Sequence, residues 1–430
     1  MEKKSDNTTP EHDSSVNESP TSNQSTNRSA GTIEAGATIK PVSRFEEITG
    51  MNISLRQVKM GIYAFLIVFL ISLFTIKPFL ARALYHNFAN VDDYRIFENR
   101  EVKAGAGQPW EIATPPFTHA APDAKTQQLL DSLDTTALLM IDQGKIAYEK
   151  YDRGGGVDEL HGSFSMAKSI VAILAGFAVQ EGAIQSVENP IKTWITEWSD
   201  RPEGDIRVRD LLSMSSGLNW RESYANPFSV TTEAYYGWGL IQTALKQRLS
   251  EELRTGKDFK YQSGSTELMG VVLSRAVNQN LSDYASVKLW QPIGAEKTAL
   301  WSLDHAVNPN EGTMHPAVEK AFCCFNARAR DFARIGQFVL QQGQWNAQPL
   351  LNSAWVKEMI TPKVADYYGY QWWVLNTRQG PIPYARGILG QYILVVPQKN
   401  RVVVRLGRQM GEREDHHPVE VRALAEWALN

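Results

Sequence analysis

Seventeen consecutive residues without a charge, Met60 to Ile76, form one long apolar run between Lys59 and Lys77. As an α-helix this run spans about 26 Å, slightly less than the roughly 30 Å of a bilayer's hydrocarbon core. Flanking lysines that snorkel toward the headgroups make up the difference. The pattern therefore predicts a single transmembrane helix over residues 58–80.

Two other interpretations of this run are weaker but remain open. A cleaved signal peptide fits the small residues at Ala81–Ala83, but its polar region before the apolar core would be more than about fifty residues long. A buried core helix is seldom uncharged on every side over such a length. Charge does not fix the orientation, because four Lys or Arg residues lie within twenty residues on one side and three on the other.

The segments on either side of this run have little hydrophobic periodicity. Half of residues 1–30 are Ser, Thr or Asn, and Phe45 is the only aromatic residue before Tyr63. Such a segment cannot bury enough apolar surface to fold, so we expect residues 1–57 to be a disordered polar tail. Residues 81–124 mix Pro, Gly and aromatic residues, and we expect a linker that packs loosely on the domain beyond it.

The remaining residues, 125–430, begin and nearly end with hairpin patterns. Thr136–Tyr151 contains two β-rich runs around Asp142-Gln143-Gly144, and Tyr392–Gly407 repeats the pattern around Pro397–Asn400. Mostly helical segments lie between them, and an amphipathic helix ends the chain. We predict an α+β domain with one antiparallel sheet built from both ends, helices on its faces and a helical insertion.

Composition excludes several classes of function. The 44 Lys and Arg residues balance 47 Asp and Glu residues, so nucleic acid is not an expected partner. Cys323 and Cys324 are the only cysteines; they cannot form a disulfide framework or, alone, a four-ligand zinc site. Two buried thiols are favoured over a vicinal redox pair. The histidines are scattered, and His416-His417 lacks the spacing of helical zinc ligands. No metal or organic cofactor is implied.

The stretch HGSFSMAKSIVAILAGF, residues 161–177, places Ser165 three residues before Lys168 at the head of an apolar run. If a helix begins near Ser165, the two side chains are neighbours on one face. Burial disfavours a charged ammonium, and a neutral amine beside a hydroxyl can take its proton and activate it for attack. The stretch alone is equally compatible with a capping serine and a lysine that snorkels into solvent.

Longer stretches decide between these interpretations. HGSFSMAKS is followed in order by IRVRDLLSMSSGLNW (206–220), FKYQSGSTELMGVVL (259–273) and GILGQYILVVP (387–397). Together they resemble the penicillin-recognising serine hydrolases, a superfamily with class C β-lactamases, DD-peptidases, esterases and 6-aminohexanoate-dimer hydrolases. The resemblance covers about residues 125–430. It implies a β-lactamase/transpeptidase-like fold.

The resemblance also implies roles for individual residues. Ser165 is the implied acylated nucleophile and Lys168 its base. Tyr261 matches the tyrosine of the second motif, whose phenol can share the proton, deliver it to the leaving group and help activate water. Ser263 stands where the family often has Asn, which implies that hydrogen bonding of the substrate by an amide is either lost or replaced by that of a hydroxyl.

The third family motif, usually Lys-Thr-Gly, aligns with Ile388-Leu389-Gly390, followed by Gln391. No cation is available there to hold a substrate carboxylate, and Arg386 is a candidate substitute. The backbone amides of Ser165 and Gln391 are the expected oxyanion donors, with Gly390 next to the substrate. The Gly-x-x-Gly-Gln form resembles the 6-aminohexanoate-dimer hydrolase branch and favours an amide or ester over a β-lactam.

The sequence therefore predicts a membrane-anchored serine hydrolase that cleaves an amide or ester bond of a small or peptide-like molecule. A β-lactamase or DD-peptidase is the runner-up, and a non-catalytic membrane-tethered binding domain is the alternative from another class. An α/β-hydrolase is excluded, because Ser163 and Ala167 stand where the nucleophile elbow needs glycine. The family's usual placement implies a single-pass protein of the bacterial inner membrane with its catalytic domain in the periplasm.

Overall fold

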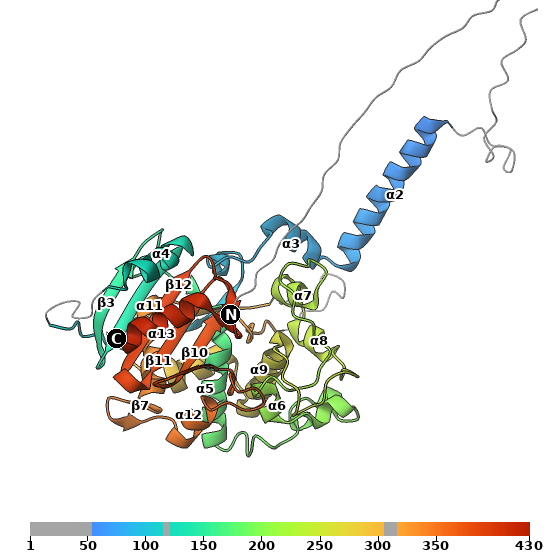
Figure 1. The fold of residues 1–430 in the computed structure, drawn as a ribbon. Helices are drawn as coiled ribbons and strands as arrows, with labels where there is room; N and C mark the ends of the chain where they lie inside the picture. The colour runs from blue at the N-terminus through green and yellow to red at the C-terminus, as the bar shows by residue number, and fades with distance from the viewer. Residues whose placement is uncertain (1–53, 115–120, 305–315) are drawn as a thin grey trace, which may run out of the picture. The chain divides into compact units, whose positions relative to one another are not determined.

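The computed structural model describes residues 54–114, 121–304 and 316–430 (Figure 1). Most of the polar tail lies outside these residues, so its disorder stays a prediction. The chain divides into two units, residues 1–65 and 66–430. The described part of the first unit, residues 54–65, is mainly the start of an apolar helix.

Helix α2, Leu55–Ile76, contains the predicted apolar run and has no buried residue. Within the described ranges it is the one helix long and apolar enough to cross a membrane. Its exposure is incompatible with a core helix, while a membrane anchor and a signal sequence both remain possible by length and composition. The helix ends four residues before the predicted position 80, because Pro78 cannot continue it and a second helix, α3 Phe79–His86, begins after that proline.

A six-stranded antiparallel sheet with the order β3-β2-β12-β11-β10-β9 forms the centre of the domain. Its strands are β2 Thr135–Asp142, β3 Lys145–Tyr151, β9 Trp373–Thr377, β10 Gly380–Gly387, β11 Gln391–Val396 and β12 Arg401–Gly407. Both predicted hairpins are confirmed. Because β2 pairs with β12, the sheet joins the two ends of the domain as expected.

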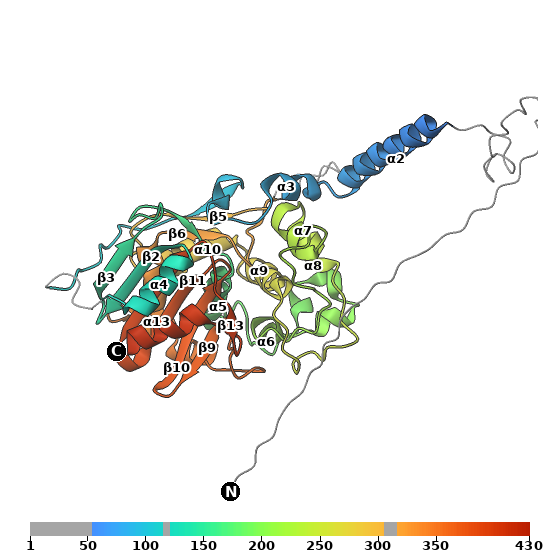
Figure 2. The same ribbon diagram turned by 45° about the horizontal axis from the view of Figure 1, so that its top comes forward.

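Helices cover both faces of this sheet. Side chains alternate along β2, so Leu139 and Ile141 pack into one core cluster while Leu138 and Met140 pack into another. Helices α5 Met166–Gln180 and α11 Ala329–Leu340 cover the first face. Helices α4 Ala124–Ser132 and α13 Val419–Leu429 lie together on the second (Figure 2).

The predicted helical insertion follows α5. Its helices are α6 Val208–Leu212, α7 Val230–Tyr236, α8 Leu240–Leu245, α9 Ser263–Val277 and α10 Leu281–Ala285. Helix α12, Ser353–Met359, packs near α5. Two short hairpins form two-stranded sheets of their own: β7 Gln344–Trp345 with β8 Gln348–Pro349, and β13 Arg413–Glu414 with β14 His417–Pro418.

A second sheet corrects two predictions. Four strands pair in the order β1-β5-β6-β4. They are β1 Asn99–Val102, β5 Ala299–Ser302, β6 Phe325–Ala327 and β4 His161–Gly162. The domain thus has more than one sheet, and the expected loose linker, residues 81–124, contributes a paired strand and the fully buried Val91 and Val102. Local periodicity missed β1 because its pairing partner lies about 200 residues later.

Candidate active site

Ser165 directly precedes helix α5, so the helix begins near this residue, as predicted. It occupies the N-cap position, and its side chain makes no capping hydrogen bond. Every residue from Met166 to Ala178 is buried, so packing fixes the start of the helix. No acceptor for the Ser165 amide is found within the described residues, as expected for an N–H at a helix start.

Lys168 lies one turn further and is only 1% exposed. Its Nζ lies 2.9 Å from Ser165 Oγ, 3.2 Å from Ser263 Oγ and 2.7 Å from the carbonyl oxygen of Phe322. These oxygens can accept all three N–H bonds of an ammonium. In a neutral amine, two N–H bonds can go to Ser263 and Phe322 while the lone pair accepts from the Ser165 hydroxyl. The site therefore satisfies the lysine both before and after it takes a proton.

Glu222 is a site residue that sequence reasoning missed. Its Oε1 accepts hydrogen bonds from Ser263 Oγ at 2.6 Å and Tyr224 Oη at 2.8 Å. Its Oε2 accepts from the Ser263 amide at 2.8 Å and Trp220 Nε1 at 2.9 Å. Ser263 thus bridges Glu222 and Lys168. No local motif marks this carboxylate, because it reaches Ser263 from a loop 41 residues earlier in the chain.

Tyr261 lies close to the same lysine. The Lys168 ammonium nitrogen is 5.1 Å from the centroid of its ring. The ring packs against Tyr368 and Trp373, at centroid distances of 6.1 and 5.5 Å. The chain therefore brings all three predicted catalytic residues, Ser165, Lys168 and Tyr261, to one place.

The third motif lies differently from the prediction. Gly387 and Ile388 line the cavity beside Ser165, and a Cβ at Gly387 would lie 2.2 Å from the carbonyl oxygen of Ser163. Strand β10 therefore approaches the head of α5 as closely as a glycine permits. The amide of Ile388 has no acceptor within the described residues.

Gln391 and Gly390 do not line that cavity. Gln391 is fully buried, and its side-chain amide bonds both to the Gly407 carbonyl oxygen, at 2.6 Å, and to the Gly407 amide, at 3.2 Å. At Gly390 a Cβ would lie 1.5 Å from the guanidinium of Arg405. This placement does not support the predicted position of Gly390 and of the Gln391 amide beside the substrate, because the turn after β10 carries both residues away from Ser165 and toward Arg405 and β12.

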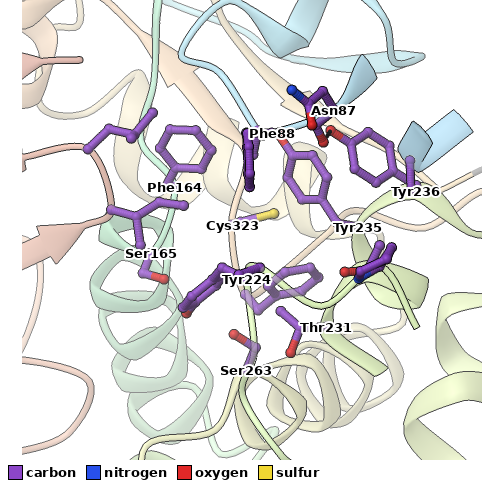
Figure 3. Close-up of a pocket in the computed structure, with 18 of the residues that line it drawn as sticks. Asn87, Phe88, Phe164, Ser165, Tyr224, Thr231, Tyr235, Tyr236, Ser263 and Cys323 are labelled. Carbon is purple, nitrogen blue, oxygen red and sulfur yellow. Dashed lines mark hydrogen bonds between the residues drawn. The ribbon is translucent and has the colours of Figure 1, made fainter. Parts of the chain in front are cut away.

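Two cavities open at Ser165. One, of about 530 Å³, is lined by polar and aromatic side chains that include Glu222, Tyr261 and Arg386. The Arg386 guanidinium lies 3.3 Å from the centroid of the Trp373 ring and donates to a backbone carbonyl at 2.8 Å. The other cavity, of about 500 Å³, has mostly apolar walls (Figure 3). Ser165 therefore lies between two chemically different spaces.

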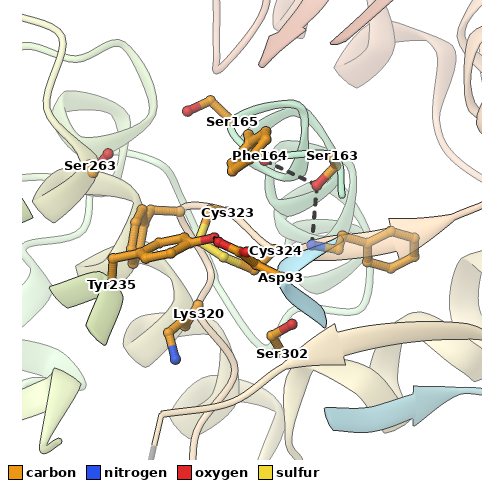
Figure 4. Close-up of a disulfide and its surroundings, with 12 residues drawn as sticks. Asp93, Ser163, Phe164, Ser165, Tyr235, Ser263, Ser302, Lys320, Cys323 and Cys324 are labelled. Carbon is orange, nitrogen blue, oxygen red and sulfur yellow. Dashed lines mark hydrogen bonds between the residues drawn. A yellow bond between two sulfur atoms is a disulfide. The ribbon is translucent and has the colours of Figure 1, made fainter. Parts of the chain in front are cut away.

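The adjacent cysteines are joined in a disulfide, which corrects the prediction of two buried thiols (Figure 4). They directly follow Phe322, whose carbonyl accepts from Lys168, and Cys323 lines the apolar cavity. The disulfide therefore lies in the loop that holds the lysine.

Two buried titratable side chains, Glu267 and Lys320, help to hold the same loop. Glu267 Oε2 accepts from the Ala321 amide at 2.9 Å, and Lys320 donates to the Leu303 carbonyl. Burial raises the pKa of Glu267 to about 8 and lowers the pKa of Lys320 to about 7.

Within the part of the chain that the structure describes, no three His, Cys, Asp or Glu side chains gather as a metal site would require.

Comparisons of the sequence with a family model and with known proteins both found matches. The family model described as Beta-lactamase matches residues 123–426. The 6-aminohexanoate-dimer hydrolase of Paenarthrobacter ureafaciens is 22% identical over 302 residues, which cover 65% of this chain and 74% of that protein.

Solved structures share the fold. A Bacillus anthracis protein provisionally assigned as a 6-aminohexanoate-dimer hydrolase superposes with a TM-score of 0.62 at 21% identity, covering 79% of this chain and 92% of the other. A family VIII carboxylesterase gives a TM-score of 0.54 at 13% identity, over 73% and 98% of the two chains. A penicillin-binding protein homologue from Caulobacter crescentus gives 0.52 at 16% identity, over 72% and 99%.

Proposed function

The chain belongs to the β-lactamase family of serine hydrolases, and we propose that it cleaves an amide or ester bond through an acyl-enzyme on Ser165. The observation that carries the proposal is the buried Lys168 amine, 2.9 Å from Ser165 Oγ. Lys168 takes the hydroxyl proton, and Oγ attacks the substrate carbonyl carbon. The three oxygens around Nζ then hold the ammonium that forms.

Two backbone amides stabilise the charge that develops on the carbonyl oxygen. The amide of Ser165 is one, and in this proposal the amide of Ile388 replaces that of Gln391 as the other. The support is that Ile388 lines the cavity at Ser165 while Gln391 does not. Preorganised amide donors of this kind are worth about 10²–10³ in rate each.

Tyr261 and Glu222 assist Lys168 in different ways. Tyr261, whose ring centroid lies 5.1 Å from Lys168 Nζ, delivers a proton to the leaving group and then helps activate water for deacylation. Glu222 touches no reacting atom. It orients the Ser263 hydroxyl so that its lone pair faces Lys168, and it is a positioning residue.

An amide or ester substrate fits the third motif better than a β-lactam. The aligned positions carry no lysine for a carboxylate, and the similar proteins include a 6-aminohexanoate-dimer hydrolase and a family VIII carboxylesterase. Arg386 lines the polar cavity, so a substrate with an anionic leaving group remains compatible.

We also propose that α2 anchors the protein in the bacterial inner membrane, with the catalytic domain in the periplasm. Support comes from the length, hydropathy and exposure of the helix. Reporter fusions at the two ends of the chain test this placement. A periplasmic reporter active only at the C-terminus supports it, and one active only at the N-terminus contradicts it.

The catalytic proposal is tested with the full chain and three substrates: p-nitrophenyl butyrate, a linear p-nitroanilide and a chromogenic cephalosporin. We expect turnover of the ester and the amide to exceed that of the cephalosporin. Lys168→Met should lower kcat/KM for the ester by about 10²–10⁴, as loss of a general base does. Lys125→Met, at an exposed position of α4, is the matched control. Wild-type rates in Lys168→Met, or no ester and amide turnover at all, would overturn the proposal.

A further inference from the structure

The apolar cavity beside Ser165 is as large as the polar one but differs in chemistry. Its walls include apolar side chains from four separate parts of the chain: Leu84, Phe88 and Ala89, Phe164, Phe322, and Ile388 and Leu389. Figure 3 shows Phe88, Phe164 and Tyr235 grouped on the side of the cavity away from Ser263. The volume of about 500 Å³ lies within the range of small-molecule sites.

Apart from the exposed side-chain amide of Asn87, for which no partner is found among the described residues, the polar side-chain atoms on these walls are already bonded within the protein. Tyr235 Oη donates to Asp93 at 2.8 Å, and Thr232 Oγ1 donates to the Asn226 carbonyl at 2.9 Å. Thr231 Oγ1 accepts from the Ser223 amide at 3.2 Å. A polar ligand group placed here would find few free partners and would pay for its desolvation. A hydrocarbon chain loses nothing in the same space.

We propose that this cavity binds the hydrocarbon chain of the acyl group, so that the substrates are esters or amides of medium- or long-chain aliphatic carboxylic acids. This inference rests on the proposed function of Ser165. Tyr261, the proposed proton donor to the leaving group, lines the polar cavity and not the apolar one. The leaving group therefore occupies the polar cavity, and the acyl chain extends into the apolar cavity on the other side of Oγ.

The mouth of the cavity is itself apolar. Leu84 and Phe88 line it and are 61% and 67% exposed, and their neighbour Tyr85 is 85% exposed. Leu84 and Tyr85 belong to α3, which begins at Phe79, with only two residues between it and the end of α2. A chain of three residues reaches at most about 11 Å, so a membrane-spanning α2 keeps the start of α3 near the bilayer surface. An amphiphilic substrate that partitions into the membrane would thus meet the mouth directly.

The first test is a series of p-nitrophenyl esters from acetate to decanoate with the full chain in detergent. Each buried methylene should raise kcat/KM about fourfold, which corresponds to about 0.8 kcal/mol, until the cavity is filled. A flat or falling series from acetate onward overturns the inference. Labelling of Ser165 by a short fluorophosphonate is measured in parallel. If labelling occurs but the series is flat, the acyl cavity is wrong and the proposed function stands; if neither labelling nor turnover occurs, both fail.

The second test narrows the cavity. Ala89 is a half-buried wall residue, so Ala89→Trp should lower the octanoate-to-acetate ratio of kcat/KM at least tenfold. Ala81→Trp places the same side chain at an exposed position of α3 that does not line the cavity, and should keep the wild-type ratio. Ester partitioning into micelles is the same for all variants and cancels. An unchanged ratio in Ala89→Trp contradicts the proposal, provided that the variant still reacts with the fluorophosphonate; if it does not react, Ala89→Phe takes its place and is judged by the same ratio.

Discussion

Replacing Glu222 by glutamine tests whether a carboxylate that contacts no reacting atom still controls the rate. The change keeps the size and shape of the side chain but removes its charge. The Ser263 hydroxyl links the two charged groups: Ser263 Oγ donates to Glu222 Oε1 at 2.6 Å and accepts from Lys168 Nζ at 3.2 Å. The carboxylate oxygen and the lysine nitrogen are therefore at most about 6 Å apart.

The magnitude follows from this separation. At an effective dielectric constant of about 20, unit charges about 6 Å apart interact by about 3 kcal/mol. Lys168 gains its charge as Ser165 loses a proton, so this interaction stabilises the transition state of acylation more than a ground state with neutral Lys168. Its removal in Glu222→Gln should slow acylation by up to about 100-fold. The Ser263 and Tyr224 hydroxyls can reverse their donor and acceptor roles, so we expect the fold to tolerate the amide.

The assay is the second-order rate constant for fluorophosphonate labelling, together with kcat/KM for p-nitrophenyl butyrate. Glu222→Asp keeps the charge and should recover part of the lost rate. Glu251→Gln removes a charge from an exposed loop and serves as the control. Both rate constants within twofold of wild type in a folded Glu222→Gln protein would refute the electrostatic role of Glu222.

Three further substitutions test the end of strand β10 at Gly387, the cation Arg386 and the buried His161. Gly387→Ala should lower ester turnover and cost about 1–3 kcal/mol of stability, because its Cβ would meet the Ser163 carbonyl at 2.2 Å. Gly156→Ala should do neither, because the nearest atom to a Cβ there, Glu159 Cβ, is 4.0 Å away. Arg386→Ala should raise KM for an ester with an anionic leaving group more than for its neutral analogue, and equal effects on both would remove the anchor role. Burial lowers the pKa of His161 from 6.5 to about 4, so the unfolded chain takes up a proton first as the pH falls. As the pH falls from 7 to 5, we expect protonation of His161 in the unfolded chain to lower the free energy of unfolding by about 2 kcal/mol. Chemical denaturation at both pH values should show that the free energy of unfolding of His161→Leu falls by about 2 kcal/mol less than that of the wild type. An equal fall in both proteins would contradict the role given to His161.

The sequence predicted the parts of the fold whose signals are local. Both hairpins, the start of α5 at Ser165 and the C-terminal helix follow from turn residues and hydrophobic period. Strand β1 was missed because Asn99–Val102 carries one apolar residue and is stabilised by distant pairing with β5. Spacing along the chain carries no information on such pairing.

In the candidate site, too, contacts between residues close in the sequence could be predicted, and contacts between distant residues could not. Ser165 and Lys168 are one helical turn apart, so their contact could be predicted from spacing. The contact of Glu222 with Ser263 joins a loop to a distant helix and has no local pattern. The second oxyanion amide was placed at Gln391 because the motif was aligned by its glycine. The structure places Ile388 at the cavity instead, since β10 ends there against the head of α5.

The measurement that tests the central claim most directly is the mass of the intact protein, followed by peptide mapping, after reaction with a fluorophosphonate. The account predicts one adduct per chain, located on Ser165, and no adduct and no ester turnover in Ser165→Ala at an unchanged melting temperature. An adduct on another residue, or ester turnover that persists in Ser165→Ala, would contradict it.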